Sequence, residues 1–175
     1  MKSCAARTAG SPPRASQPRK ETKVTAKSNA YERKLLELIF QAQAYDNLAE
    51  NDSTSPSTAL WFSLHTASPG EDGEQGTNEV SYGGYARVGV DRTTSGFSVS
   101  TSPSGSTAGA SVSPSTNVTF PQCTSGGTTA SHFAVGLTSG DSTGEILYHG
   151  ALNASLAISS GVTPRLTTAT VIRET

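Results

Sequence analysis

The sequence contains one pentapeptide with the spacing of a serine nucleophile. Residues 140–144, Gly-Asp-Ser-Thr-Gly, follow the G-x-S-x-G pattern, in which serine hydrolases place the nucleophile on a strained turn between a strand and a helix. Here the next residues are Glu-Ile-Leu-Tyr-His, a pattern typical of a strand, and no helical periodicity follows. Gly, Asp and Ser are also the residue types that tight turns favour. The pentapeptide is therefore predicted to be a hairpin turn, and Ser142 is not assigned a catalytic role.

The histidines and loop carboxylates show no pattern of a metal or acid–base site. His65, His132 and His149 are far apart in the sequence, unlike the short spacings of zinc ligands, and we interpret them as polar-face residues of strands. The carboxylates of residues 71–74 share one turn-rich loop and are expected to keep it in solvent. Phosphate loops, dinucleotide fingerprints and calcium loops are missing from the sequence. The sequence thus predicts no catalytic residue, no metal site and no cofactor, and a protein that is not an enzyme.

Three aromatic residues are the candidates for recognition of a surface. Trp61, Tyr82 and Tyr85 lie in or near predicted strands, where they could stack on a sugar or a base. Half-buried aromatic side chains of a sheet more often serve packing. Both interpretations stay open from the sequence.

The composition favours a β protein that would position these side chains. Hydrophobic residues make up 34% of the 175 residues, charged residues only 15%, and there are 17 glycines. Ser, Thr and Gly fill the remainder, as in folds with short strands and many turns. One thin core is expected, and no apolar run approaches the length of a membrane span.

Charge is divided unevenly along the chain. Up to Lys34 the net formal charge is +7, whereas from Leu35 onward it is −8. Residues 1–28 combine this positive charge with Pro, Ser and Ala and have no hydrophobic periodicity, so we expect a basic arm that becomes ordered only on an acidic partner. The candidate partner-binding residues of this arm are Lys2, Arg7, Arg14, Arg19, Lys20, Lys23 and Lys27.

Residues 29–48 have the periodicity of an amphipathic helix. Apolar side chains recur at spacings of three and four residues, and a helix this short depends on tertiary burial. The apolar face consists of Tyr31, Leu35, Leu38, Ile39, Ala42 and Tyr45, and the first four are the residues predicted to pack on the sheet or on a neighbouring copy.

Alternation of apolar and polar residues predicts a β domain over residues 58–175. In Leu60–His65, Leu60, Phe62 and Leu64 are expected to point to one side. Residues 85–90 are expected to form a strand with Ala86, Val88 and Val90 inward. Further strands are expected at 117–120, 132–137, 145–149, 152–158 and 168–173. Residues 93–117 are Ser/Thr/Gly-rich and read as an insertion, either a flexible loop or two polar edge strands. The fold class predicted is mainly β, an antiparallel β-sandwich or jelly-roll-like barrel with one N-terminal helix.

Five segments in order resemble a family of small virion proteins of tailed bacteriophages. They are LWFSLHTASPG, EVSYGGYARVGV, VTFPQCTSGGTTASHFAVG and ILYHGALNASLAISSGVTPRL, preceded by a helix that contains Leu-Leu. The resemblance covers about residues 30–173. Proteins of this family are usually described as tail fibre or minor structural proteins, and the family has no catalytic residues to transfer.

The resemblance implies a non-enzymatic structural component of a virion. Within that class, the basic arm favours a capsid decoration, cement or head-fibre protein, with a tail or tail-fibre component as the alternative. A carbohydrate- or surface-binding β module is the alternative from a different class. The expected partners are capsid or tail subunits and further copies of the chain, since repeated modules gain avidity. A membrane is not expected as a partner, and nucleic acid is not favoured.

Overall fold

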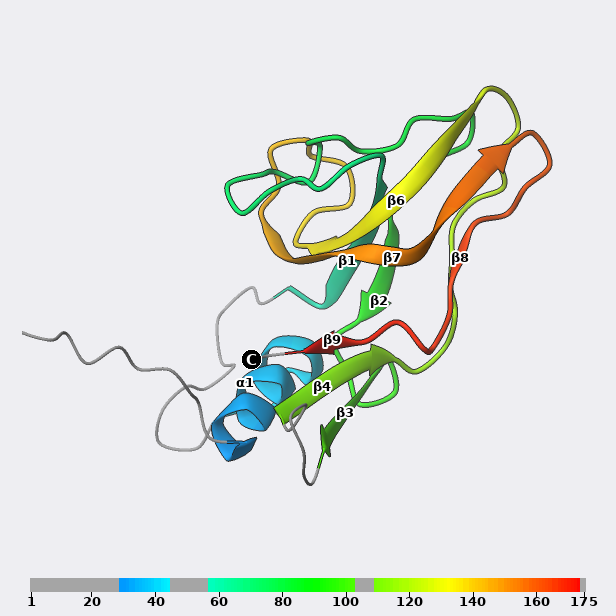
Figure 1. Ribbon diagram of the computed structural model, residues 1–175. Helices are drawn as coiled ribbons and strands as arrows, with labels where there is room; N and C mark the ends of the chain where they lie inside the picture. The colour runs from blue at the N-terminus through cyan, green and yellow to red at the C-terminus, as the bar shows by residue number, and fades with distance from the viewer. Residues whose placement is uncertain (1–28, 45–56, 103–108, 174–175) are drawn as a thin grey trace, which may run out of the picture.

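The computed structural model describes residues 29–44, 57–102 and 109–173 (Figure 1). The predicted basic arm, residues 1–28, therefore lies outside the described residues. One helix is followed by strands that are mostly short. The elements are α1 (Asn29–Gln41), β1 (Ala59–His65), β2 (Val88–Asp91), β3 (Phe97–Ser102), β4 (Gly109–Pro114), β5 (Val118–Thr119), β6 (Gly127–Gly136), β7 (Ile146–Ser159), β8 (Arg165–Leu166) and β9 (Ile172–Arg173).

All strand pairs in the described residues are antiparallel. The largest sheet has the order β2-β1-β6-β7, a second has the order β3-β4-β9, and β5 pairs with β8. In Figure 1 the four-stranded sheet lies above, and α1 lies below it together with β3, β4 and β9. This arrangement confirms the predicted mainly β fold with antiparallel sheets and one helix near the N-terminus. In the described parts of the chain, no helix is long and apolar enough to cross a membrane.

The core is continuous between the two larger sheets. Leu60, Phe62 and Leu64 of β1 are fully buried, as their alternation predicted. The Phe62 ring stacks on Phe97 of β3, with centroids 6.2 Å apart, and on Phe133 of β6, with centroids 6.5 Å apart. One aromatic side chain thus links both sheets.

The second predicted strand is shorter than expected and its inward residues differ. β2 begins at Val88, and Ala86 is exposed whereas Arg87 is buried. Val88 and Val90 are half-buried and pack against the core. The prediction for Ala86 was therefore wrong, because Arg87 enters the interior to meet polar partners that alternation alone does not reveal.

Helix α1 ends at Gln41 rather than near residue 48. Ala42 has a φ of 54°, in the left-handed region, and the following turn closes with Gln43 N donating to Glu37 O. The terminal carbonyl groups are held by Arg92, whose Nε donates to Ile39 O at 2.6 Å and whose Nη2 donates to Leu38 O at 2.9 Å. A positive charge that donates hydrogen bonds at this end stabilises a helix.

The helix buries a different face from the predicted one. Leu36 and Phe40 are fully buried, while Leu35, Leu38 and Ile39 are half-buried. The side chain of Tyr31 lies outside the described residues. Phe40 meets Phe97 edge-on, with ring centroids 5.0 Å apart. The predicted packing face is thus rotated relative to the buried one, and an assembly role for it stays a prediction.

The Ser/Thr/Gly-rich segment contributes to the core. β3 and β4 pair over six residues each, and β4 is the central strand between β3 and β9. Phe97, Ala110 and Val112 are buried under α1. The loop interpretation is therefore wrong for residues 97–102 and 109–114, and the edge-strand interpretation holds for β3 but not for β4.

Two of the expected strands are one. β7 runs without interruption through Gly150, but its pairing with β6 is irregular. Ala130 pairs with Leu156 and His132 pairs with Ala151, so residues 152–155 of β7 face a single residue of β6 and form a bulge. The final predicted strand, 168–173, is limited to β9.

Candidate functional site

The G-x-S-x-G pentapeptide is a turn in the connection from β6 to β7. Asp141 Oδ1 accepts hydrogen bonds from Thr143 N at 2.9 Å and from Thr143 Oγ1 at 2.8 Å, and these bonds lower the pKa of the Asp141 carboxyl group. Ser142 is exposed, and the turn leads into strand β7 rather than into a helix. The prediction of a hairpin turn is confirmed.

The three histidines do not converge. His65 is fully buried, His132 lies opposite it on β6, and His149 is exposed on β7. The His65 ring lies between Ser63 Oγ and Thr77 O, each 2.8 Å away. A carbonyl oxygen only accepts, so Nδ1 carries the proton and Nε2 accepts from the serine. Burial lowers the pKa of His65. The interpretation of His65 as a polar-face residue was therefore wrong, since the chain after β1 folds over it.

Residue Ser131 is adjacent to His132 but is not activated as a nucleophile. Its Oγ donates to Thr66 O at 2.7 Å, so the single hydroxyl proton is used. The His132 Nδ1 atom, 2.8 Å from the same oxygen, must then donate to it. Within the described residues, no group of three or more His, Cys, Asp or Glu side chains is arranged to hold a metal ion.

The polar side chains that do converge form a buried network. Arg87 Nε and Nη2 donate to Glu79 Oε1 and Oε2, both at 2.8 Å. Arg87 Nη1 donates to Thr138 O at 3.1 Å and to Asp141 O at 2.9 Å. The hydrogen bonds to Glu79 raise the pKa of Arg87. One guanidinium group therefore joins the loop before β2 to the turn after β6, as only a planar fork of donors can.

A second connection across the same region comes from Gln75. Its Oε1 accepts from Thr138 N at 2.9 Å and from Thr138 Oγ1 at 3.0 Å. Gln75 is fully buried, and its Nε2 has no hydrogen-bond partner among the described residues. Residues 71–78 were expected to sit in solvent. That is wrong for Gln75, because the loop is attached to the β6–β7 turn.

The three candidate recognition aromatics occupy different environments. Tyr82 is buried and its hydroxyl donates to Pro121 O at 2.9 Å, while Tyr85 donates to Glu79 Oε1 at 2.8 Å. Burial raises the pKa of both tyrosines. Trp61 is half-buried and lies opposite Gly89 of β2. The hydroxyl groups of both tyrosines thus donate hydrogen bonds inside the body, whereas the Trp61 side chain makes no hydrogen bond to the part of the chain that the structure describes.

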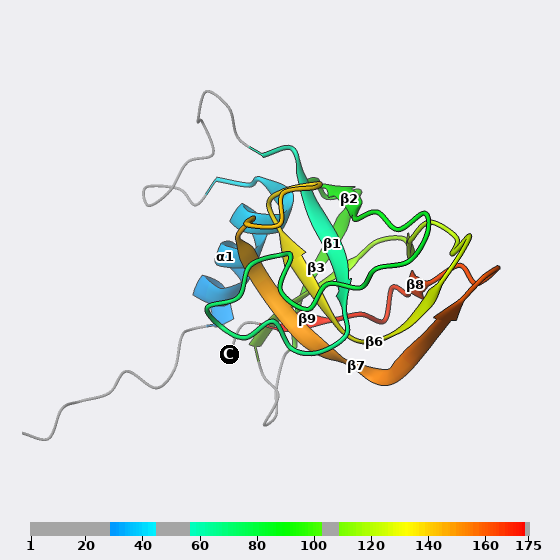
Figure 2. The same ribbon diagram turned by 90° about the horizontal axis from the view of Figure 1, so that it is seen from above.

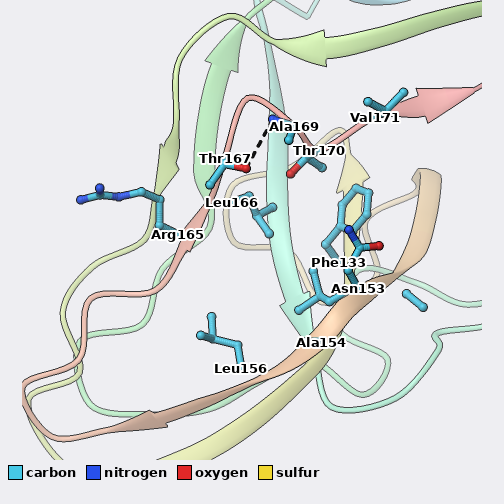
Figure 3. Close-up of a pocket in the computed structure, with 12 residues that line it drawn as sticks. Phe133, Asn153, Ala154, Leu156, Arg165, Leu166, Thr167, Ala169, Thr170 and Val171 are labelled. Atoms are coloured by element: carbon cyan, nitrogen blue, oxygen red, sulfur yellow. Dashed lines mark hydrogen bonds between the residues drawn. The ribbon is translucent and has the colours of Figure 1, made fainter.

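A groove with a mixed apolar and polar lining lies on the described surface (Figure 3). It has a volume of about 380 Å³ and lies between β7 and residues 165–171. Phe133 of β6 lies between these two walls. Asn153, Thr167 and Thr170 supply the polar groups, and Arg165 lies at one margin. Nothing in the sequence pattern indicated this groove, because it depends on the bulge of β7.

A family model described as podophage GP4 fiber I protein gp80 matches residues 26–173. The chain belongs to this family. No curated protein matches the chain. Membership of the fiber I family makes the chain a structural, fibre-type component of a phage virion, and it suggests that the chain is not an enzyme.

Several residues of the buried polar interior lie in the segments that resemble the fiber I family. Glu79 and Arg87 lie within the segment EVSYGGYARVGV, and His65 lies within LWFSLHTASPG. The segments that carried the resemblance therefore supply part of the buried network, whereas Gln75 and Thr138 lie between them. Sequence reasoning missed Gln75, Glu79 and Arg87 as interior residues, and only the segment around Glu79 and Arg87 was singled out by the resemblance.

Proposed function

We propose that this fibre-family protein decorates or cements the phage head, as a capsid decoration or head-fibre protein anchored through residues 1–28. The observation that carries the proposal is the division of charge. Seven of the nine cations before Leu35 belong to the arm, while the rest of the chain, residues 29–175, has a net charge of −7. A basic segment tethered to an acidic body is suited to an acidic site on a neighbouring subunit.

Residues 29–175 contain six Lys or Arg against thirteen Asp or Glu, and three of these six cations are already bound within the body. Arg87 and Arg92 are engaged with interior acceptors, and Arg33 pairs with Glu37 at 2.9 Å. Exposed carboxylates are contributed by Glu71, Asp72, Glu74, Asp141 and Glu145. Electrostatic attachment to an acidic shell therefore depends on Lys2, Arg7, Arg14, Arg19, Lys20, Lys23 and Lys27.

The alternative within the same class is a tail or tail-fibre component. It is favoured by the description of the family as a fiber protein. Capsid and tail subunits are the proposed partners in the two cases. In either place, several copies per particle would add avidity to a weak single contact. Half-buried Leu35, Leu38 and Ile39 on α1 are a second proposed contact between subunits.

A carbohydrate- or surface-binding module is the alternative from a different class. It is favoured by Trp61, whose half-buried indole faces a glycine and not a bulky neighbour. Tyr82 and Tyr85 would support that site from within. Binding to a glycan array that is lost in a Trp61→Ala protein would favour this function.

The proposal is tested on phage particles. Particles assembled with a chain that lacks residues 1–28 are expected to lose the protein, while the isolated body retains its β-sheet circular dichroism. Imaging of a tagged full-length chain distinguishes a label on the head from a label on the tail. Normal incorporation of the shortened chain would contradict anchoring by the arm, and a label on the tail would contradict decoration of the head.

A further inference from the structure

Strand β7 forms an open edge of the largest sheet. In the described residues it pairs with β6 alone (Figure 2), although it is the longest strand of the body. The bulge at residues 152–155 turns Leu152, Asn153 and Ala154 into one wall of the groove (Figure 3). Edges of this kind are usually protected, because unpaired backbone groups bind other chains.

The protection that charge normally gives is missing from this edge. None of the 14 residues of β7 is Lys, Arg, Asp, Glu or Pro. Among the described residues that line the groove, Arg165 is the one formal charge. In Figure 3 its side chain extends away from the groove. Two copies of this surface can therefore approach each other without opposing like charges across the contact.

The opposite wall carries an apolar side chain in solvent. Val171 is 45% exposed and is the exposed large hydrophobic residue of the described chain. It lies at the rim of the groove, at the other end from Arg165 (Figure 3). Leu152, Leu156 and Leu166 line the same groove. The face thus has both a projecting apolar side chain and a hollow of matching polarity, which is the self-complementarity that a two-fold contact requires.

We propose that this face is an interface between two copies of the chain, in which Val171 of each copy enters the groove of the other. With the bulge counted as one position, the 14-residue strand is about 36 Å long, and a contact along it at a depth of about 10 Å buries roughly 700 Å² in total. Filling both grooves brings the contact to about the 1,000 Å² expected of a specific interface. The contact is therefore weak in isolation and suited to repeated subunits in a particle.

This interface differs in its physical origin from anchoring by the arm. An apolar contact keeps its strength when salt is added, whereas a contact between a basic arm and an acidic surface weakens. Self-association that persists at high salt thus reports on the β7 face, whatever the position of the protein in the particle.

The test is sedimentation of the full chain over a range of concentrations at low and high NaCl. The wild type is expected to form dimers at both salt levels. Val171→Asp and Ala154→Lys each place a charge in the contact and are expected to raise the dissociation constant at least about tenfold. Ala86→Asp is the matched control, because Ala86 is exposed away from the groove, and it is expected to dimerise normally.

Mixing the two charged variants tests the reciprocal geometry. Val171→Asp and Ala154→Lys are expected to form a heterodimer, since one of its two contacts pairs opposite charges and the other is unchanged. Three outcomes would overturn the proposal. They are a wild type that stays monomeric, charged variants that dimerise like the wild type, and a mixture that stays monomeric. A wild-type monomer whose Ala154→Lys variant no longer enters particles would assign the groove to a different virion subunit.

Discussion

Arg87 and Glu79 meet in a two-point ion pair inside the body. The guanidinium group donates from Nε and Nη2 to the two carboxylate oxygens, and both distances are 2.8 Å. The Arg87 side chain is 4% exposed and that of Glu79 is 16% exposed. The third nitrogen of the guanidinium binds carbonyl groups of the β6–β7 turn. The pair thus reinforces a connection that backbone hydrogen bonds also make, from Gln75 N to Gly144 O and from Gly76 N to Ser142 O.

Loss of this arginine should strongly destabilise the fold. Arg87→Ala leaves the Glu79 carboxylate and two carbonyl groups without their donor, so we expect the free energy of unfolding to fall by about 3–5 kcal/mol. Urea denaturation followed by circular dichroism measures this change. Arg33→Ala is the comparison, because its pair with Glu37 is exposed on α1, and a loss of only about 0.5 kcal/mol is expected. Equal losses in the two variants would contradict a special role for the buried pair.

The stability should fall in mildly acidic solution because of His65. Burial lowers the pKa of His65 below its ordinary value of 6.5 in the folded state, so the unfolded chain binds the proton more tightly. The contribution of neutral His65 to the free energy of unfolding is fully present above pH 6.5. It is lost as the pH falls toward the pKa of His65 in the folded state. The slope approaches about 1.4 kcal/mol per pH unit for one proton.

This pH dependence is measured by urea denaturation at several pH values. His65→Gln is expected to be less stable at neutral pH but to lack the additional slope that the wild type shows below the ordinary histidine pKa. His149→Gln removes an exposed histidine and should keep the slope. A slope that survives in His65→Gln would assign the proton to another group.

Gly136, the last residue of β6, and Gly140, in the turn that follows, should differ in their tolerance of alanine. A Cβ on Gly136 would overlap Gln75 Cδ and lie 2.5 Å from Glu145 O, whereas a Cβ on Gly140 meets nothing within 4 Å. Gly136→Ala is therefore expected to cost about 1–3 kcal/mol through overpacking, while Gly140→Ala is expected to change stability by less than about 0.5 kcal/mol. Thermal denaturation compares them. Similar melting temperatures would show that Gln75 moves aside freely.

Substitution of Ser142 should leave the protein unchanged. The side chain is exposed, and the turn is closed by Asp141 and Thr143. We expect Ser142→Ala to show the same background hydrolysis of an activated ester as the wild type and a stability within about 0.5 kcal/mol. Asp141→Ala, which removes the acceptor for Thr143, should lower stability instead. Ester hydrolysis that depends on Ser142 would overturn the assignment of a turn.

The elements that could be predicted from the sequence are those in which apolar and polar residues alternate and the apolar side faces the core. Leu60, Phe62 and Leu64 were identified because local polarity and burial agree in β1. The buried face of the helix was harder to predict, since residues 35–40 are Leu-Leu-Glu-Leu-Ile-Phe and are compatible with more than one apolar stripe. Packing of α1 against β3 and β4 determines which stripe is buried. These two strands lie in a segment whose composition suggests a loop.

The interior polar residues needed information from distant parts of the chain. Arg87 and Gln75 both bind Thr138, which is more than 50 residues away in each case. Local patterns class such side chains as solvated, because their partners are brought together only by the tertiary fold. The resemblance located the segments around Arg87 but could not assign its partners.

The hydrogen bonds of Arg92 have a consequence for protein engineering. The same guanidinium that holds Leu38 O and Ile39 O also donates from Nη1 to Ser57 O at 2.7 Å. The carbonyl groups of Leu38, Ile39 and Ser57 are therefore held by one side chain, although residues 39 and 57 are 18 positions apart in the sequence. The entropy cost of lengthening a segment between two fixed ends rises by only about 0.6 kcal/mol for each doubling. A foreign peptide inserted between Ala44 and Ser57 is thus expected to leave the described body folded.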